Sequence, residues 1–395
     1  MSMGKHLNIF SLLLCVMAMS VAFISYGEEA ERQQTNDNGD FWSELLASSE
    51  AFRQAKCQKE GLFFRCLSGY ESSYFGYVGR DENHLDGSHL EFKVSIKYPL
   101  WGSLVDLDDS TKEDKRSQAL YFAYTGKYDF YFGSRYSAPV ISRQQNPGIF
   151  YQYQYDSRES GFQHFSLGYF HESNGQEIDD QQMFDSKVIE LLDKICRENE
   201  SNQCITDSRH QQEARAMATD YLSRGWDYLA ASTKYTKRHS HDLFGRKIAV
   251  QTDFYFSARS YFNWQGLGFV EGREENIDWL ADIDNPGDKV YDYRTFQLTI
   301  NRKLDSLACE ANQSRAQCLA NNNPANWFDY MADNTEWNLT LMSGNELNHL
   351  SYQLEFIHYI AGHFPLKLMY FNGYGENIST YQRKSSYWMI GIDLW

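Results

Sequence analysis

A histidine and a serine stand two residues apart near the middle of the chain, in the stretch His-Glu-Ser-Asn-Gly at residues 171–175. The preceding run, residues 165–170, has the composition of a β-strand. Because successive strand side chains point to opposite faces, His171 and Ser173 share one face. That face also carries Phe165, Leu167 and Tyr169. An imidazole can take the proton of a neighbouring hydroxyl and so activate it, and the spacing therefore predicts a base beside a nucleophile on an apolar surface.

The surroundings of this strand decide how the pair is interpreted. A His-x-Ser pair in a strand is usually structural. If the strand faces lipid, however, a polar group on its outer side costs free energy unless it is paired or used. A lipid-facing strand would therefore favour a functional pair.

Several other segments alternate apolar and polar residues over about ten positions, as strands of membrane barrels do. In residues 89–98 the apolar set is Leu90, Phe92, Val94, Ile96 and Tyr98. The same alternation occurs in residues 247–257, 296–300 and 349–356. A soluble β-sandwich would show shorter strands and more Gly and Pro turns, whereas this chain has only 6 Pro.

The pattern predicts twelve strands, an even number that closes an antiparallel barrel without an unpaired edge in lipid. We expect them near residues 73–80, 89–99, 118–132, 148–157, 163–173, 223–236, 246–259, 290–303, 336–343, 348–360, 365–374 and 384–395. The predicted fold class is all-β, a twelve-stranded antiparallel transmembrane β-barrel with a short helical N-terminal periplasmic segment and long loops.

Composition excludes other classes of protein. Aromatic residues make up 16% of the chain, with 28 Tyr, yet no apolar stretch of about 18 residues follows the N-terminal leader. The chain is therefore not a helical membrane protein. The net charge of −16 argues against nucleic acid as a partner.

The N-terminus reads as an export signal. Lys5 precedes an apolar run over residues 7–24, and small residues, Ser25 and Gly27, follow it. We expect residues 1–27 to be a signal peptide rather than a retained anchor, with 28–70 an N-terminal periplasmic segment and 71–395 the barrel. Cys15 follows leucines instead of a small residue, so acylation is not expected.

The six cysteines after the leader fall in three local pairs, which in an exported chain predict three short disulfide loops. The pairs are Cys57 with Cys66, Cys196 with Cys204, and Cys309 with Cys318. The middle pair lies in a long insertion, residues 176–222, where Val188, Leu191, Leu192 and Ile195 have the spacing of one helix face. This insertion is predicted to be a small ordered lobe and a candidate lid.

Five motifs together resemble the outer-membrane phospholipase A family of Gram-negative bacteria, a phospholipase A1. They are Tyr98-Pro99-Leu100-Trp101, His171-Glu172-Ser173-Asn174-Gly175, Ser223-Arg224-Gly225-Trp226-Asp227, Gly373-Tyr374-Gly375-Glu376 and Asp393-Leu394-Trp395. The resemblance implies a twelve-stranded barrel in the bacterial outer membrane. It also implies calcium-dependent hydrolysis of acyl esters in glycerophospholipids.

The family's motif assigns the general base to His171 and the nucleophile to Ser173. The Ser173 backbone amide would contribute to the oxyanion hole. The family's third catalytic residue is an asparagine, and the matching position here is Asp227. A carboxylate can orient an imidazole in the same way, so we expect a Ser-His-Asp set.

The resemblance also implies calcium and a second copy of the chain. Matching calcium ligands are Ser223, the Gln176 carbonyl and, across the dimer, Ser137; Asp179 or Asp180 would complete the site. The implied partners are membrane phospholipid as substrate, outer-membrane lipid and a reversible homodimer that switches activity on.

Two alternatives stay open from the sequence. A non-enzymatic porin or adhesin barrel would leave His171 and Ser173 as incidental neighbours and would need a wide polar lumen. A barrel protease with acidic pairs at its rim is compatible with the many acidic residues, although Asp179-Asp180 is more simply a solvated loop.

Overall fold

The structure is a computed structural model that describes residues 67–79, 88–103, 117–131, 143–155, 160–178, 181–198, 204–243, 246–262, 290–306, 331, 334–347, 349–360 and 364–394. Several predictions lie outside these ranges. They are the leader and most of the N-terminal segment, the pairs Cys57–Cys66 and Cys309–Cys318, Ser137, and the Asp179-Asp180 pair.

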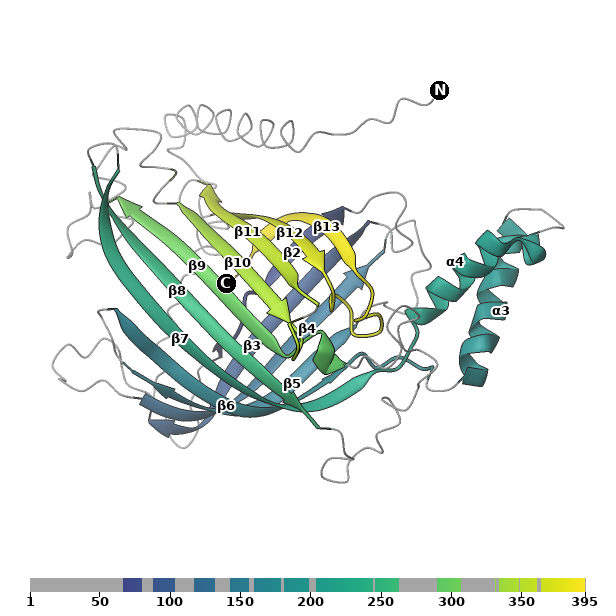
Figure 1. The fold of residues 1–395 in the computed structure, drawn as a ribbon, viewed down its shortest axis with the longest axis horizontal. Helices are drawn as coiled ribbons and strands as arrows, with labels where there is room; N and C mark the ends of the chain where they lie inside the picture. Colours follow the sequence, from purple (N-terminus) through teal and green to yellow (C-terminus); the bar gives the residue numbers. More distant parts are fainter. Residues whose placement is uncertain are drawn as a thin grey trace, which may run out of the picture.

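One antiparallel sheet closes on itself to form a barrel (Figure 1). Its strands are β1 (Ser68–Gly69), β2 (Tyr74–Gly79), β3 (His89–Ser103), β4 (Ser117–Phe130), β5 (Gln144–Gln154), β6 (Gly161–Ser173), β7 (Gly225–Leu243), β8 (Arg246–Tyr261), β9 (Phe296–Ser306), β10 (Thr335–Ser343), β11 (Ser351–Ile360), β12 (Phe364–Gly373) and β13 (Ser385–Asp393). β1 and β2 pair with successive parts of β3 and share one position, so the barrel has twelve. The predicted twelve-stranded antiparallel barrel is confirmed, and the predicted helical N-terminal segment lies outside the described residues.

Chain neighbours pair around the whole barrel, and β13 closes it by pairing with β2. Each strand is antiparallel to the next. Each of the twelve predicted segments corresponds to one strand, from β2 to β13. Closure pairs the backbone of every strand on both sides, which a sheet surrounded by lipid requires.

The outer wall of the barrel is apolar, as the alternation predicts. Its exposed large side chains include Phe75, Tyr77, Ile149, Tyr151, Phe165, Leu167, Leu229, Phe256, Trp337, Leu354 and Trp388. An apolar belt this extensive is not expected on a water-soluble barrel, because soluble proteins keep exposed apolar patches small. The barrel is therefore one that spans a membrane.

The inner wall is polar, and its charged side chains pair between neighbouring strands. Lys367 is fully buried and lies 3.2 Å from the Glu355 carboxylate and 3.1 Å from that of Asp393. Lys234 and Asp253 form a second pair at 2.9 Å. These ion pairs link neighbouring strands on the luminal side of the wall.

The insertion between β6 and β7 is a small helical lobe that projects from the barrel (Figure 1). It contains α3 (Gln181–Glu198), the 3₁₀ turn η1 (Cys204–Thr206) and α4 (Ser208–Thr219); a second 3₁₀ turn, η4 (Val290–Asp292), precedes β9. The lobe has a hydrophobic core separate from the barrel, made of Ile178, Phe184, Leu191, Ala214, Ala218 and Leu222. The predicted face of α3 packs against this core.

No helix in the described part of the chain is both long and apolar enough to cross a membrane.

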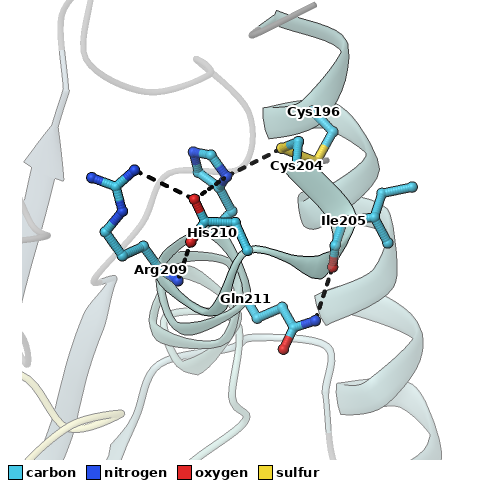
Figure 2. The surroundings of a disulfide bond; sticks show 7 residues. Cys196, Cys204, Ile205, Arg209, His210 and Gln211 are labelled. Atoms are coloured by element: carbon cyan, nitrogen blue, oxygen red, sulfur yellow. Dashed lines mark hydrogen bonds and ion pairs between the residues drawn. A yellow bond between two sulfur atoms is a disulfide. The ribbon is translucent and has the colours of Figure 1, made fainter. Parts of the chain in front are cut away.

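The Cys196–Cys204 disulfide joins the end of α3 to η1, which confirms the middle predicted pair (Figure 2). Asp207 then caps α4, accepting a hydrogen bond from the Arg209 backbone amide at 2.9 Å. That hydrogen bond holds the pKa of the Asp207 carboxyl below its usual value. The side chain of Gln211 donates to the Ile205 carbonyl at 2.8 Å, so η1 and α4 form one compact corner.

Because the lobe has a separate core, its stability should be separable from that of the barrel. Phe184 is 1% exposed, and Phe184→Ala should cost the lobe about 3–5 kcal/mol. We expect faster hydrogen exchange over residues 181–219 with an unchanged thermal midpoint of the barrel. Ile189→Ala, at a side chain 68% exposed, is the matched control and should change neither quantity. A fall in the barrel midpoint for Phe184→Ala would contradict a separate lobe.

Candidate active site

The outer faces of β6 and β7 bring His171 and Asp227 together. The two residues are direct partners in the antiparallel register, and Ser173 lies opposite Gly225. On β6 the exposed fraction alternates, with Leu167 50% exposed but Phe170 4% and Glu172 fully buried. His171 and Ser173 therefore share the outer face, as the sequence predicts, although nothing in the spacing of residues 171 and 227 reveals their pairing.

Asp227 is the centre of a small hydrogen-bond group. Its Oδ1 lies 3.0 Å from His171 Nδ1 and accepts a hydrogen bond of 2.7 Å from the Tyr169 hydroxyl. A proton on Nδ1 satisfies the first of these contacts and leaves Nε2 as the basic nitrogen of the ring. The arrangement can thus hold the imidazole in one orientation and one tautomer.

Sequence reasoning missed the contact made by Tyr169. The signal was present, because Tyr169 is two residues before His171 and was assigned to the same face of the strand. What could not be read was the register of β7, which sets Asp227 within reach of both side chains.

Ser173 is the next outward residue after His171. Two residues along a strand are separated by about 6.6–6.8 Å between Cα atoms. No hydrogen bond joins the two side chains in the described structure, so the hydroxyl and the ring share a surface without direct contact. Catalytic hydrogen bonds often tighten only when substrate is bound.

Between these two residues Glu172 points into the lumen and anchors the end of β6. Its carboxylate lies 3.0 Å from Arg294 Nη1 and 3.4 Å from Arg259 Nη1, and it accepts a hydrogen bond from the Gln144 side chain. Two cations and an amide around one buried carboxylate fix the backbone from which His171 and Ser173 project. This inner cluster was not predicted, because its members come from four separate parts of the chain.

The turn after β6 is tied to the chain segment that enters β7. The Asn174 side chain donates to the Leu222 carbonyl at 2.6 Å and accepts from the Arg224 amide at 3.0 Å. Gly175 has φ of 56°, a left-handed conformation that favours glycine. The Arg143 side chain donates to the Gly175 carbonyl at 2.9 Å, a contact that the sequence did not suggest.

This turn places two predicted calcium ligands in adjoining segments. Gln176 follows Gly175, and the Ser223 amide donates to the Ile178 carbonyl at 2.8 Å, which holds the segment after β6 against the segment before β7. A backbone carbonyl and a hydroxyl are hard oxygen donors, so the residues present fit calcium in their chemistry.

Fold and site together define a membrane-spanning β-barrel with a histidine, a carboxylate and a serine on its outer wall. The family model of phospholipase A1 matches residues 67–185, the segment that carries His171 and Ser173. This match agrees with the resemblance seen in the sequence over that part of the chain.

Solved structures with a similar fold include the outer membrane phospholipase A of Escherichia coli, at 14% identity and a TM-score of 0.47, covering 87% of this chain and 99% of that one. A calcium-bound dimer of the Salmonella typhi outer membrane phospholipase matches at 13% identity and a TM-score of 0.46, covering 87% and 96%. No curated protein matches the chain significantly.

If Asp227 orients His171, its hydrogen-bonding oxygen should matter more than its charge. Asp227→Asn keeps an oxygen that can accept from Nδ1 and from Tyr169, and we expect phospholipid hydrolysis within about tenfold of wild type. Asp227→Ala removes the acceptor and should lower kcat by about 100-fold or more. Initial rates on phospholipid in mixed micelles compare the two. Full turnover in Asp227→Ala would remove this residue from the site.

Proposed function

We propose that the protein hydrolyses acyl ester bonds of glycerophospholipids in a calcium-dependent reaction, with activity of the phospholipase A1, A2 and lysophospholipase type. Ser173 is the nucleophile, His171 the general base and Asp227 the residue that orients it. The observation that carries the proposal is the direct pairing of His171 with Asp227 on the lipid-facing wall, next to Ser173. A membrane lipid can reach such a site without leaving the bilayer.

In the acylation step, His171 Nε2 takes the Ser173 hydroxyl proton while the serine oxygen attacks the ester carbonyl carbon. The tetrahedral intermediate collapses, the ester C–O bond breaks, and the imidazolium returns the proton to the leaving lysophospholipid alkoxide. Water then attacks the acyl-enzyme by the same route and releases a fatty acid. The Asp227 carboxylate stabilises the imidazolium formed in each step.

The wall around the site suits the substrate's acyl chains. Leu167 on β6, Ile149 and Tyr151 on β5 and Leu229 on β7 are all exposed on the outer face. They are close neighbours in the register, with Leu167 opposite Tyr151. Acyl chains can lie along this surface while the ester group reaches Ser173 at the end of the strand.

Calcium bound by the Gln176 carbonyl and Ser223, with Ser137 of a second copy, would supply positive charge beside the developing oxyanion. The Ser173 backbone amide is the proposed protein donor to that oxyanion. His171 and Ser173 carry the proton transfer, and Asp227 orients His171 and stabilises its charged form.

Dimerisation is the proposed switch. The apolar outer faces of β5 to β7 would pair with those of a second copy and complete both the calcium site and the acyl-chain surface. A switch of this kind needs substrate or calcium to bind the dimer more tightly than the monomer. It would keep a hydrolase silent inside its own membrane.

A non-enzymatic porin would give no role to the pairing of His171 with Asp227 on the lipid-facing wall.

The test is hydrolysis of phospholipid in mixed micelles, with calcium or with a chelator, by wild type and by Ser173→Ala. We expect wild-type activity with calcium only, and background rates for Ser173→Ala in both conditions. Ser166→Ala is the matched control, because Ser166 is on the same strand but faces inward and hydrogen bonds to Ser232. Activity that persists in Ser173→Ala, or in wild type with chelator, would overturn the proposal.

A further inference from the structure

A second group of possible metal ligands lies inside the barrel, on strands that the proposed catalytic residues do not occupy. His89 and Glu91 are on β3, and Asp129 is on β4. The register pairs Glu91 directly with Asp129, and residues 89, 91 and 129 all face the lumen. Each is 1% exposed or less.

The three side chains converge. One ligand atom from each lies within 4.8 Å of the other two. His89 Nε2 is 3.6 Å from Asp129 Oδ2 and 3.9 Å from Glu91 Oε2. Two donors bound tetrahedrally to one cation with bonds of about 2.0–2.2 Å lie about 3.3–3.6 Å apart, so the His89–Asp129 separation suits a shared ion and the His89–Glu91 separation is slightly longer. Both are too long for a hydrogen bond.

The Asp129 carboxylate gives an independent indication of a ligand. Both of its oxygens are buried, and neither accepts a hydrogen bond from any residue in the described ranges. Buried carboxylates are normally paired or hydrogen-bonded, because the desolvation of an unpaired buried ion costs on the order of several kcal/mol. Asp129 points at His89 and Glu91 with its lone pairs available.

The charges around the group favour a cation. Lys127 Nζ lies 2.9 Å from Glu91 Oε2 and balances one of the two carboxylates. The other carboxylate remains, and Glu376, in the turn between β12 and β13, acts electrostatically on Asp129 as a further negative charge. The local field is therefore negative even with Lys127 in place.

We propose that His89, Glu91 and Asp129 form a luminal site for a divalent transition-metal cation such as Zn²⁺, separate from the calcium site. The imidazole sets the selectivity, because histidine nitrogen suits zinc and related ions, whereas calcium takes oxygen ligands. The cation would bridge β3 and β4 near the barrel end that also carries Ser173. A bridging ion at that position would stabilise the folded barrel.

The competing explanation is a protonated His89 that pairs with Asp129 and needs no metal. A protonated imidazole has no lone pair for a cation, so this explanation predicts no stoichiometric binding. The two explanations therefore differ in a direct titration.

The experiment is a Zn²⁺ titration of the full, untagged, folded chain after removal of metal, with calcium present in excess to fill oxygen-only sites. We expect one Zn²⁺ per chain and a rise in the thermal midpoint. Asp129→Asn and His89→Gln should each weaken binding by at least about 100-fold, since even indirect ligands contribute 10–100-fold. Matched controls are the luminal variants Asp253→Asn and His358→Gln, which should bind as wild type.

Zinc X-ray absorption of the wild-type complex tests the same site without any variant, and should show imidazole nitrogen together with carboxylate oxygen. The absence of stoichiometric binding by wild type would overturn the proposal. So would a zinc shell without imidazole, or binding that survives both Asp129→Asn and His89→Gln.

Discussion

The candidate site of this protein depends on the two-residue period of a closed barrel. Closure pairs the backbone of each strand on both sides, and the pleat then sends alternate side chains to lipid and to the lumen. At the end of β6 this places His171 and Ser173 outside and Glu172, between them, fully inside. One strand thus carries a candidate reactive surface on its outer side and that surface's anchor on its inner side.

The carboxylates of Glu172 and Asp227 lie in different environments, one buried inside the barrel and one on its lipid-facing wall. Inside, the Glu172 carboxylate is buried but meets Arg259, Arg294 and Gln144, so its charge is compensated. Outside, the Asp227 charge is costly on a lipid-facing wall, although less so than the about 2–4 kcal/mol that Arg or Lys costs at mid-bilayer, and the cost falls toward the interface. Its hydrogen bonds with Tyr169 and His171 offset that cost, since bonds to charged groups contribute about 1.5–3 kcal/mol each.

Local pattern was sufficient for the elements. The twelve strands follow from alternation, the helical lobe from the spacing of Val188, Leu191, Leu192 and Ile195, and the Cys196–Cys204 bond from proximity in the chain. The shared outer face of His171 and Ser173 followed from the pleat alone. Each of these depends on residues close together in sequence.

Contacts between residues far apart in the sequence could not be predicted from local pattern. The register between strands decides which side chains meet, as in the contacts of Tyr169 with Asp227, Glu172 with Arg294 and His89 with Asp129. Alternation does not fix the register, because a shift of a strand by any even number of residues keeps the same side chains on the same face. The role of Asp227 was predicted from the family resemblance and not from the strand pattern, and its contact with Tyr169 was not predicted. The luminal His89, Glu91 and Asp129 appeared in the sequence only as polar positions of two strands.

The central claim is that Ser173 is a nucleophile activated on the lipid-facing wall. A long-chain alkyl sulfonyl fluoride, presented in micelles with calcium, tests it most directly, because it forms a stable sulfonyl ester only with an activated hydroxyl. Mass spectrometry of the digested protein should find one modification per active chain, on the peptide that contains Ser173, and none when His171 is replaced by Ala. Modification at another serine, or none in a chain that hydrolyses phospholipid, would contradict the account.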